Sequence, residues 1–537
     1  MPNGRRGSDK DERDDIDHFR RRKPQRFAVS RRGMVSTAHY RATEAGVAVL
    51  EQGGNAMDAA VAAAFALGVC EPAASGLGGQ TMILFRGAES GRTVALDGSS
   101  RAPHRATPGL LGSEERRRGY RSTTVPSTPA TLGYALSRHG KLDLATVLAP
   151  AISLAQEGYE VTELQRTLTR RERRHLMAGS AGPLFLRDGR KSYPAGARFK
   201  QPALARTLKR LARTGVEDFY TGRIARAIDA DMTRNEGLLR RDDLAQIPWP
   251  IERRPVSCRY ESLRVMTFPP PGAGRTLVEM LHILSHLPAR DRDPDTPRGA
   301  VMLAEVIRRA FLDRRDRPFD PEFYAQVEAK QMLSSEYART AARRIRRGLA
   351  RRGETTHLST MDHEGNVVAL TQSIERVYGA CVATPELGFL YNDYMSAFEY
   401  DDISHPYYLR PNAAPWASVA PTIVFKGRRA WLAIGSPGSE RITPSILQVL
   451  LRLESHGPFE AVDAPRLHCS LDRTVSLEAS RMRDDIPLEL EKRGFKIKER
   501  DPYSFYLGCV QLVMRDRREL IGVADPRRDG AAGGCKA

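Results

Sequence analysis

One short run of the sequence could do covalent chemistry by itself: Glu354-Thr355-Thr356-His357. A threonine hydroxyl is a weak nucleophile and needs a base close by. If the chain were cut before Thr355, the freed α-amine, with an ordinary pKa of about 7.7–8.0, could be that base. Two threonines at the start of a strand are also ordinary β-formers. The residues alone therefore leave two interpretations open, a self-activating nucleophile and the plain beginning of a strand.

Other catalytic patterns find little support. The run from Gly76 to Thr81, Gly-Leu-Gly-Gly-Gln-Thr, lacks the lysine of a phosphate loop and precedes a strand, so it predicts a tight turn with close backbone packing. There is no His-Glu-x-x-His and no close cysteine pair, and lone histidines such as His39 and His104 are more often structural than metal-bound. We therefore expect neither a metal nor another cofactor.

The charge of the chain invites a nucleic-acid hypothesis. The 537 residues carry a formal charge of +19, and residues 1–33 hold eleven Lys/Arg against six Asp/Glu. Seven arginines crowd a second stretch between Arg339 and Arg352. No zinc finger, RNP-like run or basic motif with interleaved aromatic residues accompanies them. We expect solvated basic surface and no specific nucleic-acid partner.

Composition places the protein among globular chains, with 41% hydrophobic and 28% charged residues. The six cysteines show no Cys-x-x-Cys spacing, which favours reduced, buried thiols. The N-terminus has no apolar signal segment, and the most apolar stretch, 56–70, contains Asp58 and is too short to cross a bilayer. The expectation is a cytoplasmic protein without a membrane partner.

The elements that must position Thr355 follow from hydrophobic periodicity. Residues 1–32 are expected to be a disordered basic tail. Helices are predicted over 41–52 and, with Asn55 as N-cap, over 57–69, where alanines all round indicate a buried helix. Short strands are predicted over 81–86 and 92–97. Helical patterns dominate 131–243, and a rigid loop of prolines and glycines, 268–274, leads into a further helix.

The pattern changes abruptly at Thr355. An arginine-rich helix or linker, 331–354, gives way to alternating strands over 356–362 and 367–373. The other predicted elements of this half are a hairpin of 422–425 with 430–435, helices near 443–453 and 488–493, and strands over 509–514 and 519–523. Two antiparallel sheets with helices outside is the economical packing.

Several blocks of the sequence resemble one known family. They include Gly53-Gly54-Asn55-Ala56-Met57-Asp58-Ala59-Ala60, Ser75-Gly76-Leu77-Gly78-Gly79, Pro269-Pro270-Pro271, Thr355-Thr356-His357, Gly435-Ser436-Pro437-Gly438 and Asp525-Pro526-Arg527-Arg528. In this order, over about 500 residues, they are similar to the gamma-glutamyltranspeptidase (glutathione hydrolase) family of N-terminal-nucleophile hydrolases.

The resemblance implies an α+β fold, a four-layer αββα sandwich made as one precursor. That precursor would cut itself between Glu354 and Thr355, giving a large subunit, 33–354, and a small subunit, 355–537. Thr355 would then be nucleophile and base at once. Ser373 stands where the family has a second threonine that supports the nucleophile's hydroxyl, and Gly438 and Ser439 occupy the pair whose N–H groups form the oxyanion hole.

The residues that hold the amino-acid part of the substrate depart from the family. Ser99 stands where the family has an arginine for the substrate carboxylate. Arg101, two positions later, lies on the same side of an extended chain but about 6.6 Å further along, which leaves open whether it replaces that arginine. Glu375 replaces an asparagine. In the run Asn392-Asp393-Tyr394-Met395-Ser396-Ala397, Tyr394 replaces a glutamine and Ala397 an acid, and of a Ser-Ser pair only Ser418 remains.

These features favour a self-processing N-terminal-threonine hydrolase or acyltransferase whose small-molecule substrate is not an ordinary γ-glutamyl donor. Amide hydrolysis of a small polar acid and carbon–carbon hydrolysis, as in family members from antibiotic pathways, both fit. A second hypothesis is an ordinary glutathione hydrolase or transpeptidase with a variant pocket. A third is a non-catalytic scaffold or a basic nucleic-acid-associated protein.

Overall fold

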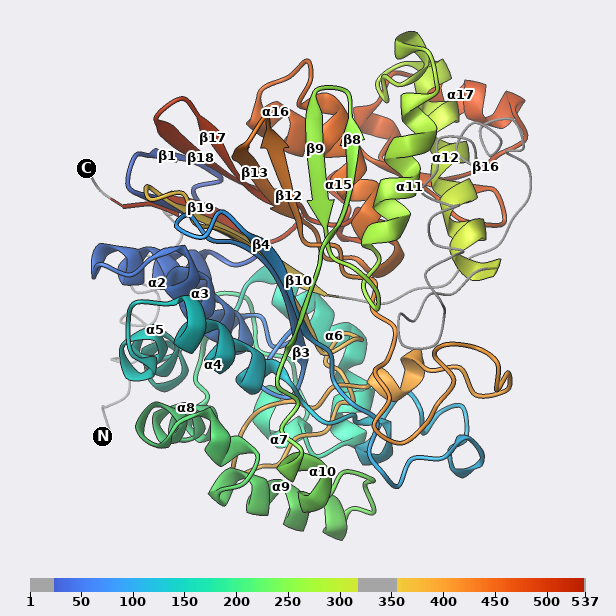
Figure 1. Cartoon of the computed structure of the whole chain (residues 1–537). Coiled ribbons are helices and arrows are strands. Elements are labelled where there is room, and N and C mark those ends of the chain that lie inside the picture. Colours follow the sequence, from blue (N-terminus) through green and yellow to red (C-terminus); the bar gives the residue numbers. More distant parts are fainter. Residues whose placement is uncertain (1–23, 317–354, 536–537) are drawn as a thin grey trace, which may run out of the picture.

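Two sheets of seven strands each lie face to face, with helices on both outer sides (Figure 1). The computed structural model describes residues 24–316 and 355–535. All strand pairs within the two sheets are antiparallel. The architecture confirms the predicted α+β class and the four-layer αββα sandwich.

Thr355 lies at one end of the strands of the first sheet, because it directly precedes the inner strand β10. In order across the sheet, the strands are β19 (Ala531–Gly534), β2 (Gly33–Thr37), β10 (Thr356–Asp362), β11 (Val367–Ser373), β3 (Gln80–Arg86), β4 (Thr93–Gly98) and β7 (Ile251–Arg253). Strands from before and after Thr355 are therefore mixed within one sheet, and β10 and β11 lie between β2 and β3.

The second sheet has the same interleaved character. Its strands, in order, are β1 (Phe27–Ser30), β18 (Glu519–Ala524), β17 (Gln511–Asp516), β13 (Arg429–Gly435), β12 (Thr422–Lys426), β9 (Leu263–Thr267) and β8 (Val256–Tyr260). Smaller pairings join β5 (Tyr159–Glu160) to β6 (Arg198–Phe199), and β14 (Leu467–Cys469) to β15 (Thr474–Leu477) and β16 (Lys496–Glu499).

Helices from the N-terminal part cover the first sheet, in the lower half of Figure 1. They are α2 (Tyr40–Glu51), α3 (Ala56–Cys70), α4 (Thr128–His139), α5 (Leu144–Glu157), α6 (Glu163–Ala178), α7 (Gly182–Phe185), α8 (Pro202–Thr214), α9 (Arg223–Arg234) and α10 (Arg241–Ala245). The helices on the second sheet are α11 (Gly274–Ser285), α12 (Pro297–Asp316), α15 (Ile442–Arg452), α16 (Pro458–Asp463) and α17 (Asp485–Lys492).

Helix α3 lies in the middle of the helical layer, as its all-round apolar sequence predicts. Asn55 caps it: the Asn55 side chain accepts from the N–H groups of Met57 and Asp58, and the Asp58 carboxylate accepts from the N–H of Asn55. Every residue of the helix except Gly68 is buried. A rigid, dry helix therefore supports the face of β10, β11 and β3 that turns away from the second sheet.

The core between the two sheets shows which side chains face inward. Met361 of β10, Ala369 of β11 and Met82 of β3 belong to this core, together with Ile423 and Ala433 of the second sheet. Because side chains alternate along a strand, residues two, four or six positions away from these point to the same face. This alternation determines which polar side chains at the ends of the strands point into the space between the sheets.

The prediction of a disordered tail over residues 1–32 is wrong for its last part. Phe27–Ser30 forms β1 and pairs with β18, because an edge strand gains its hydrogen bonds from a partner almost 500 residues away. Such pairing leaves little trace in a short, highly charged segment. Residues 1–23 and the arginine-rich stretch up to Glu354 lie outside the described residues.

Other strands were also missed, among them β2, β7, β8, β9 and β19. The cysteines within the described ranges are all free, and five of the six are buried. Across residues 24–316 and 355–535, the helices are too short or too polar for any of them to traverse a lipid bilayer.

Candidate active site

Four polar residues form a row across one end of the first sheet. The register pairs Ser373 with Gln80, Thr356 with Gln372 and Thr81 with Gly98. Continuing each register by one residue places Thr355 beside Ser373 and Ser99 beside Gln80. Neighbouring strands lie about 4.8 Å apart. Thr355, Ser373, Gln80 and Ser99, hereafter the catalytic row, are therefore adjacent in that order on four neighbouring strands.

The same alternation points the catalytic row into the space between the sheets. Thr355 lies six residues before Met361, Ser373 four after Ala369, and Gln80 two before Met82, all members of the inter-sheet core. Thr355 is 2% exposed and Ser373 1%. Hydroxyls in such a dry place depend strongly on their hydrogen-bond partners.

The glycine-rich turn before Gln80 lets two chain segments approach each other closely, as predicted. A side chain on Gly79 would collide with the carbonyl oxygen of Ser373, and one on Gly78 with that of Leu390. These two glycines therefore let β3 and the segment after β11 lie directly against each other. The turn therefore positions Gln80 at the start of β3, next to Ser373.

Thr356, next to the candidate nucleophile, is fixed from the other face of the sheet. Its hydroxyl donates to Glu71 Oε2 at 2.5 Å, and the Arg528 guanidinium holds Glu71 Oε1 at 2.7 Å. Glu71 follows α3, and Arg528 lies in the C-terminal part. This buried chain of contacts ties the beginning of β10 to segments from both ends of the sequence.

His357 joins the catalytic row to the second sheet. Its ring packs on Gly435 of β13, where any side chain would collide with the imidazole. Nδ1 lies 2.8 Å from the Thr371 hydroxyl and Nε2 3.1 Å from the Ser359 hydroxyl. Complete burial lowers the pKa of His357 to about 3, so the ring is neutral. Gly435 in turn precedes the loop with Gly438.

Gly438 and Ser439 form a sharp turn at the end of β13. Their φ angles are +123° and +54°, and Ser439 is one of few non-glycine residues held in the left-handed region. Neither N–H donates to another residue in the described ranges. A serine at this φ is strained by roughly 1 kcal/mol, yet it keeps its backbone donor. The pair can therefore still offer two N–H groups to an oxygen.

Ser373 ends β11 and is followed by a tightly wound loop. The N–H of Glu375 donates to the Ser373 hydroxyl at 2.9 Å, and Glu375 itself has a φ of +74°. Arg376 pairs with the buried Asp393 at 3.0 Å. Burial raises the pKa of Asp393 to about 6, against the opposing effect of Arg376. The loop is thus held from two sides next to the row.

Tyr394 lies beside the row, and Asn392 holds it there. The Asn392 side chain accepts from the N–H of Tyr394 and donates to the carbonyl of Gly78 at 2.7 Å. Burial raises the pKa of Tyr394 far above its usual value, and the charge of Glu375 raises it further. The phenol is therefore neutral and close to Glu375 and Ser373.

Ser99 is tied to Asp97 instead of facing an open pocket. Its hydroxyl donates to Asp97 Oδ1 at 2.6 Å, and Arg253 of β7 donates to Asp97 Oδ2 at 2.7 Å. The structure gives Arg101 a backbone bridge with Val125, but no hydrogen bond or ion pair of its side chain within the described residues. Among the described residues, no hydrogen bond or ion pair therefore joins the side chain of Arg101 to the row.

Two other predicted residues are not joined to the row. Ser418 is buried, but no hydrogen bond connects it to Thr355 or Ser373 among the described residues. Ala397 closes the short 3-10 helix η5 (Tyr394–Ala397) and offers no polar group. Glu354, the residue before the candidate cleavage point, lies outside the described residues.

Three residues of this neighbourhood escaped the sequence analysis: Gln80, Glu71 and Arg253. Gln80 was treated only as part of a turn, and Arg253 is more than 150 residues away from Asp97. Only the strand register brings them to the site, and register cannot be read from a single sequence. His39 and His104, in contrast, are structural as predicted: His39 caps α2, and His104 pairs with Asp243.

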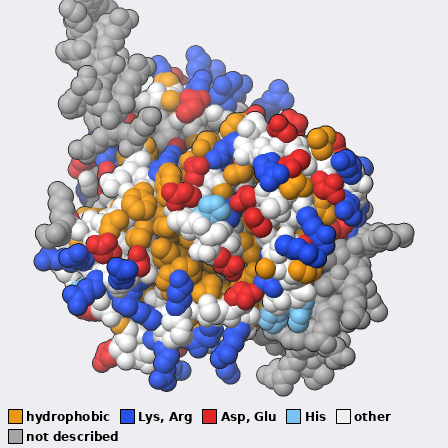
Figure 2. Space-filling model, turned by 90° about the horizontal axis from the view of Figure 1, so that it is seen from above, with side chains coloured by type: hydrophobic (Ala, Val, Ile, Leu, Met, Phe, Trp, Pro, Cys, Tyr) orange, Lys and Arg blue, Asp and Glu red, His pale blue; other side chains and the backbone are white. Residues whose placement is uncertain are grey.

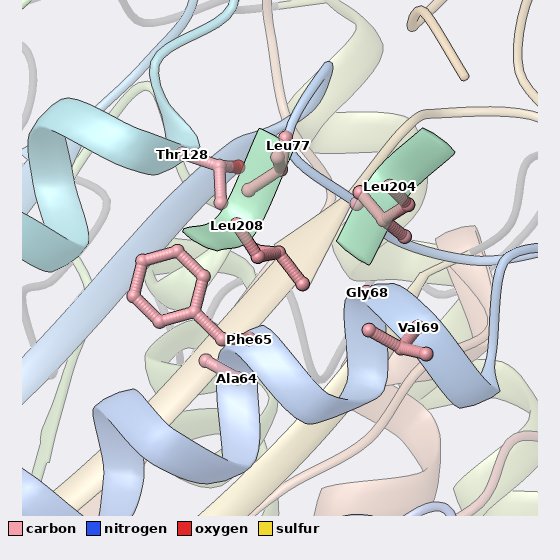
Figure 3. Close-up of a pocket in the computed structure, with 9 residues that line it drawn as sticks. Ala64, Phe65, Gly68, Val69, Leu77, Thr128, Leu204 and Leu208 are labelled. Carbon is pink, nitrogen blue, oxygen red and sulfur yellow. The ribbon is translucent and has the colours of Figure 1, made fainter. Parts of the chain in front are cut away.

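A separate pocket lies on the other side of the first sheet, between α3 and α8 (Figure 3). Phe65, Leu77, Leu204 and Leu208 point into it, and Thr128 supplies the one side-chain hydroxyl. It holds no group that could act as acid, base or nucleophile. Over residues 24–316 and 355–535, no cluster of three His, Cys, Asp or Glu side chains could bind a metal.

The surface of the described residues carries both charges. On the face shown in Figure 2, Lys and Arg side chains alternate with Asp and Glu around a central area rich in hydrophobic side chains.

Comparison with known proteins places the chain. The sequence profile of the family described as gamma-glutamyltranspeptidase matches residues 42–535. A glutathione hydrolase proenzyme of Escherichia coli (strain K12) is 30% identical over 535 residues, covering 93% of this chain and 91% of that protein. An acylase ACY 1 proenzyme of Pseudomonas sp. (strain V22) is 34% identical over 535 residues, covering 94% and 93%.

A solved structure agrees with this placement. The crystal structure of cephalosporin acylase from Bacillus halodurans matches with a TM-score of 0.88 at 29% identity, covering 95% of this chain and 97% of that one. The catalytic row and the turn at Gly438 thus lie in a fold shared along nearly the whole chain. The chain belongs to the gamma-glutamyltranspeptidase family and is an enzyme of its hydrolase and acyltransferase type.

Proposed function

We propose that this protein is a self-processing N-terminal-threonine acylase whose acyl substrate differs from an ordinary γ-glutamyl group. The observation that carries the proposal is the contrast within the catalytic row. Strand register places the Thr355 and Ser373 hydroxyls next to each other, whereas Ser99, at the far end, is tied to Asp97. The nucleophilic end is complete and the amino-acid-binding end is changed.

Self-cleavage starts with the Thr355 hydroxyl. Its oxygen attacks the carbonyl carbon of Glu354, the C–N bond breaks, and the nitrogen takes a proton to become the α-amine of Thr355. The resulting ester of Glu354 is then hydrolysed by water, which leaves a carboxylate on Glu354 and restores the hydroxyl. The word proenzyme in the names of relatives supports this step.

Turnover reuses the same groups. The α-amine of Thr355 accepts the proton of the hydroxyl as it attacks the substrate's acyl carbon, and the leaving amine takes that proton. The N–H groups of Gly438 and Ser439 stabilise the oxyanion. Ser373 orients the nucleophile through its hydroxyl. Water, or another amine as acceptor, then releases the acyl group from Thr355.

The changed residues disfavour a substrate with a free α-amino acid end. A carboxylate near Glu375 would meet a like charge, and Ser99 offers no guanidinium in its place. One relative is named an acylase and one structural neighbour a cephalosporin acylase. These names support an acyl group of another kind, including that of an antibiotic or related metabolite. The cytoplasmic location remains a prediction from the sequence.

A second candidate is an ordinary glutathione hydrolase, and the 30% identity to the Escherichia coli protein of that name favours it. One experiment separates the two. Purified protein is incubated, and the chains are identified by N-terminal sequencing. We expect a shorter chain beginning Thr355-Thr356-His357, and its mass should increase on reaction with aliphatic anilides but little with glutathione. Intact chain after long incubation would refute both candidates; rapid glutathione hydrolysis would favour the second.

A further inference from the structure

Gln80 is a buried amide in the middle of the catalytic row. It is 2% exposed. Its Oε1 accepts from the N–H of Ser100 at 2.9 Å and from the Ser100 hydroxyl at 3.1 Å. A backbone N–H can only donate, so Oε1 is fixed as the acceptor and Nε2 must point the other way. The orientation of the amide therefore follows from its partners.

Gln80 Nε2 carries two N–H donors, is buried, and forms no hydrogen bond of normal geometry among the described residues. The Tyr394 phenol lies within hydrogen-bonding reach, and the Gln80 side chain lowers the pKa of that phenol. One phenol oxygen can take only one of the two N–H groups, so at least one N–H of Nε2 has no acceptor. Because Met82, two residues further on, faces the inter-sheet space, Gln80 faces it too. Buried amide donors are rarely left unpaired unless something else supplies the acceptor.

We propose that Gln80 Nε2 binds an uncharged oxygen of the substrate's acyl group. The inference rests on the proposed function, in which Thr355 takes up that acyl group, and it adds a residue that selects the acyl group. The oxygen belongs to a ketone, amide or ester carbonyl, the neutral groups that accept strongly from an amide N–H.

Geometry limits where this oxygen can lie. Gln80 and Thr355 are two strands apart, about 10 Å between backbones. Part of this distance is taken up by the Thr355 and Gln80 side chains, by the bond that the Thr355 oxygen forms with the acyl carbon, and by the hydrogen bond from Nε2. The rest corresponds to an acyl chain whose oxygen lies about four bonds from the scissile carbonyl carbon. An acyl chain of this kind would extend from Thr355 along the row, past Ser373.

The charges around Gln80 favour a neutral oxygen over a carboxylate. The negative charge of Glu375 acts on the neighbouring Tyr394. At the Ser99 end, Arg253 already pairs with Asp97 at 2.7 Å. A substrate carboxylate would therefore approach the negative side chains of Glu375 and Asp97, and the charge of Arg253 is already paired with Asp97.

Three p-nitroanilides test the proposal on processed wild-type protein. The 4-oxopentanoyl anilide has a ketone oxygen four bonds from the scissile carbon, the pentanoyl anilide has none, and the succinyl anilide has a carboxylate there. We expect kcat/KM for the ketone to exceed that for pentanoyl by about tenfold, with succinyl lowest. Equal values for ketone and pentanoyl would overturn the proposal.

Two variants assign the preference to Nε2. Gln80→Glu keeps an acceptor for Ser100 and replaces the donor, and Gln80→Met removes the donor without adding a charge. Both should bring the ketone-to-pentanoyl ratio close to one. Ser100→Ala, the matched control, leaves the Ser100 N–H on Oε1 and should keep most of the preference. A ratio that survives in Gln80→Met, or that falls equally in Ser100→Ala, would contradict a direct contact.

Binding separates this inference from the proposed function. Calorimetry compares 4-oxopentanamide with pentanamide on wild type and Gln80→Met. If none of the anilides is hydrolysed but the ketone binds about tenfold more tightly through Gln80, the inference stands and the acylase proposal falls. If the anilides are hydrolysed without any preference, the acylase proposal stands and the inference falls.

Discussion

The two ends of the catalytic row differ in how their polar groups are used. At the Thr355 end, the Thr355 and Ser373 hydroxyls lie on neighbouring strands, and His357 of the first sheet packs against Gly435 of the second. At the Ser99 end, Asp97 takes up the serine hydroxyl and the Arg253 guanidinium. In the proposed function, the hydroxyls at the Thr355 end react with the substrate. At the Ser99 end, the polar groups of Ser99, Asp97 and Arg253 are paired with one another.

This contrast teaches that reaction and recognition can change separately in one row of residues. In the proposed function, the groups at the Thr355 end act on an acyl carbon whatever is attached to it. The groups at the Ser99 end would decide which acyl chains fit. The following predictions test that separation, beginning with the largest effect.

Thr355→Ala should abolish both cutting and turnover, a loss of roughly 10⁴-fold or more, because nucleophile and base are the same residue. Gels should show one intact chain, and no anilide should be hydrolysed. Thr356→Ser is the control: it keeps the hydroxyl for Glu71 and should still be cut. If Thr355→Ala were still cut into two chains, the nucleophile would be another residue and the Thr355 end would not be the reactive end of the row.

Activity on a γ-glutamyl anilide should be about 10²–10⁴-fold below that of the Escherichia coli relative measured in parallel. Two charge-assisted contacts are lost, each worth about 1.5–3 kcal/mol. Ser99→Arg with Glu375→Asn should recover part of kcat/KM while leaving cutting unchanged. Wild-type activity equal to the relative's would mean that the Ser99 end still recognises amino acids.

Ser373→Ala should slow cutting and turnover together, by roughly 10–10²-fold, because the nucleophile loses a hydroxyl that orients it. Ser373→Thr should restore most of both rates. The readout is the rate of chain cleavage beside kcat for one anilide. A change in KM alone would assign Ser373 to recognition and blur the two ends.

Acid should act first on the reaction and later on stability. The Thr355 α-amine must be neutral, so kcat/KM should fall below about pH 7.7–8.0. The pKa of His357 and that of His39 are lowered by burial to about 3. The unfolded chain binds these protons below about pH 6.5 and the folded chain does not, so stability is lost as pH falls from there.

The predicted loss of stability in acid is checked by measuring the melting temperature between pH 7.5 and 4.5. His39→Asn keeps a good cap for α2 and should flatten the decline by about one proton. An unchanged slope would show that His39 is not buried neutral. If kcat/KM and the melting temperature fell over the same pH range, acid would inhibit the enzyme by unfolding it.

Two deletions should have the smallest effects, and they should differ. Removing residues 1–23 takes away none of the described contacts and should leave activity and melting temperature nearly unchanged. Removing residues 1–30 also removes β1 and the Arg26 contacts to the carbonyls of Asp525 and Arg528, so it should lower the melting temperature by several degrees. Equal behaviour of both proteins would make β1 dispensable.

Local patterns predicted much of this fold. The hairpin of β10 and β11 has the predicted bounds, and α3 begins at the predicted cap, because alternation and capping are written in neighbouring residues. The edge strands β1 and β19 were not predicted, since their stability comes from distant partners. Local sequence contains no information on those partners.

The candidate site divides in the same way. Thr355, Ser373 and Gly438 were identified through family motifs, and the structure places the first two side by side. The position of Gln80 between Ser373 and Ser99 depends on the register of two strand pairs, β11 with β3 and β3 with β4. The tie between Ser99 and Asp97 could be suspected from their spacing, but Arg253 could not.

Each sheet contains strands from both sides of Thr355, and this arrangement determines what cutting before Thr355 would do to the molecule. The break removes one peptide bond, yet β10 and β11 stay hydrogen-bonded between β2 and β3, which belong to the other product. Neither product could leave without breaking both sheets. The two chains should therefore not separate on dilution or exchange with those of another molecule, and they should come apart only when the whole domain unfolds.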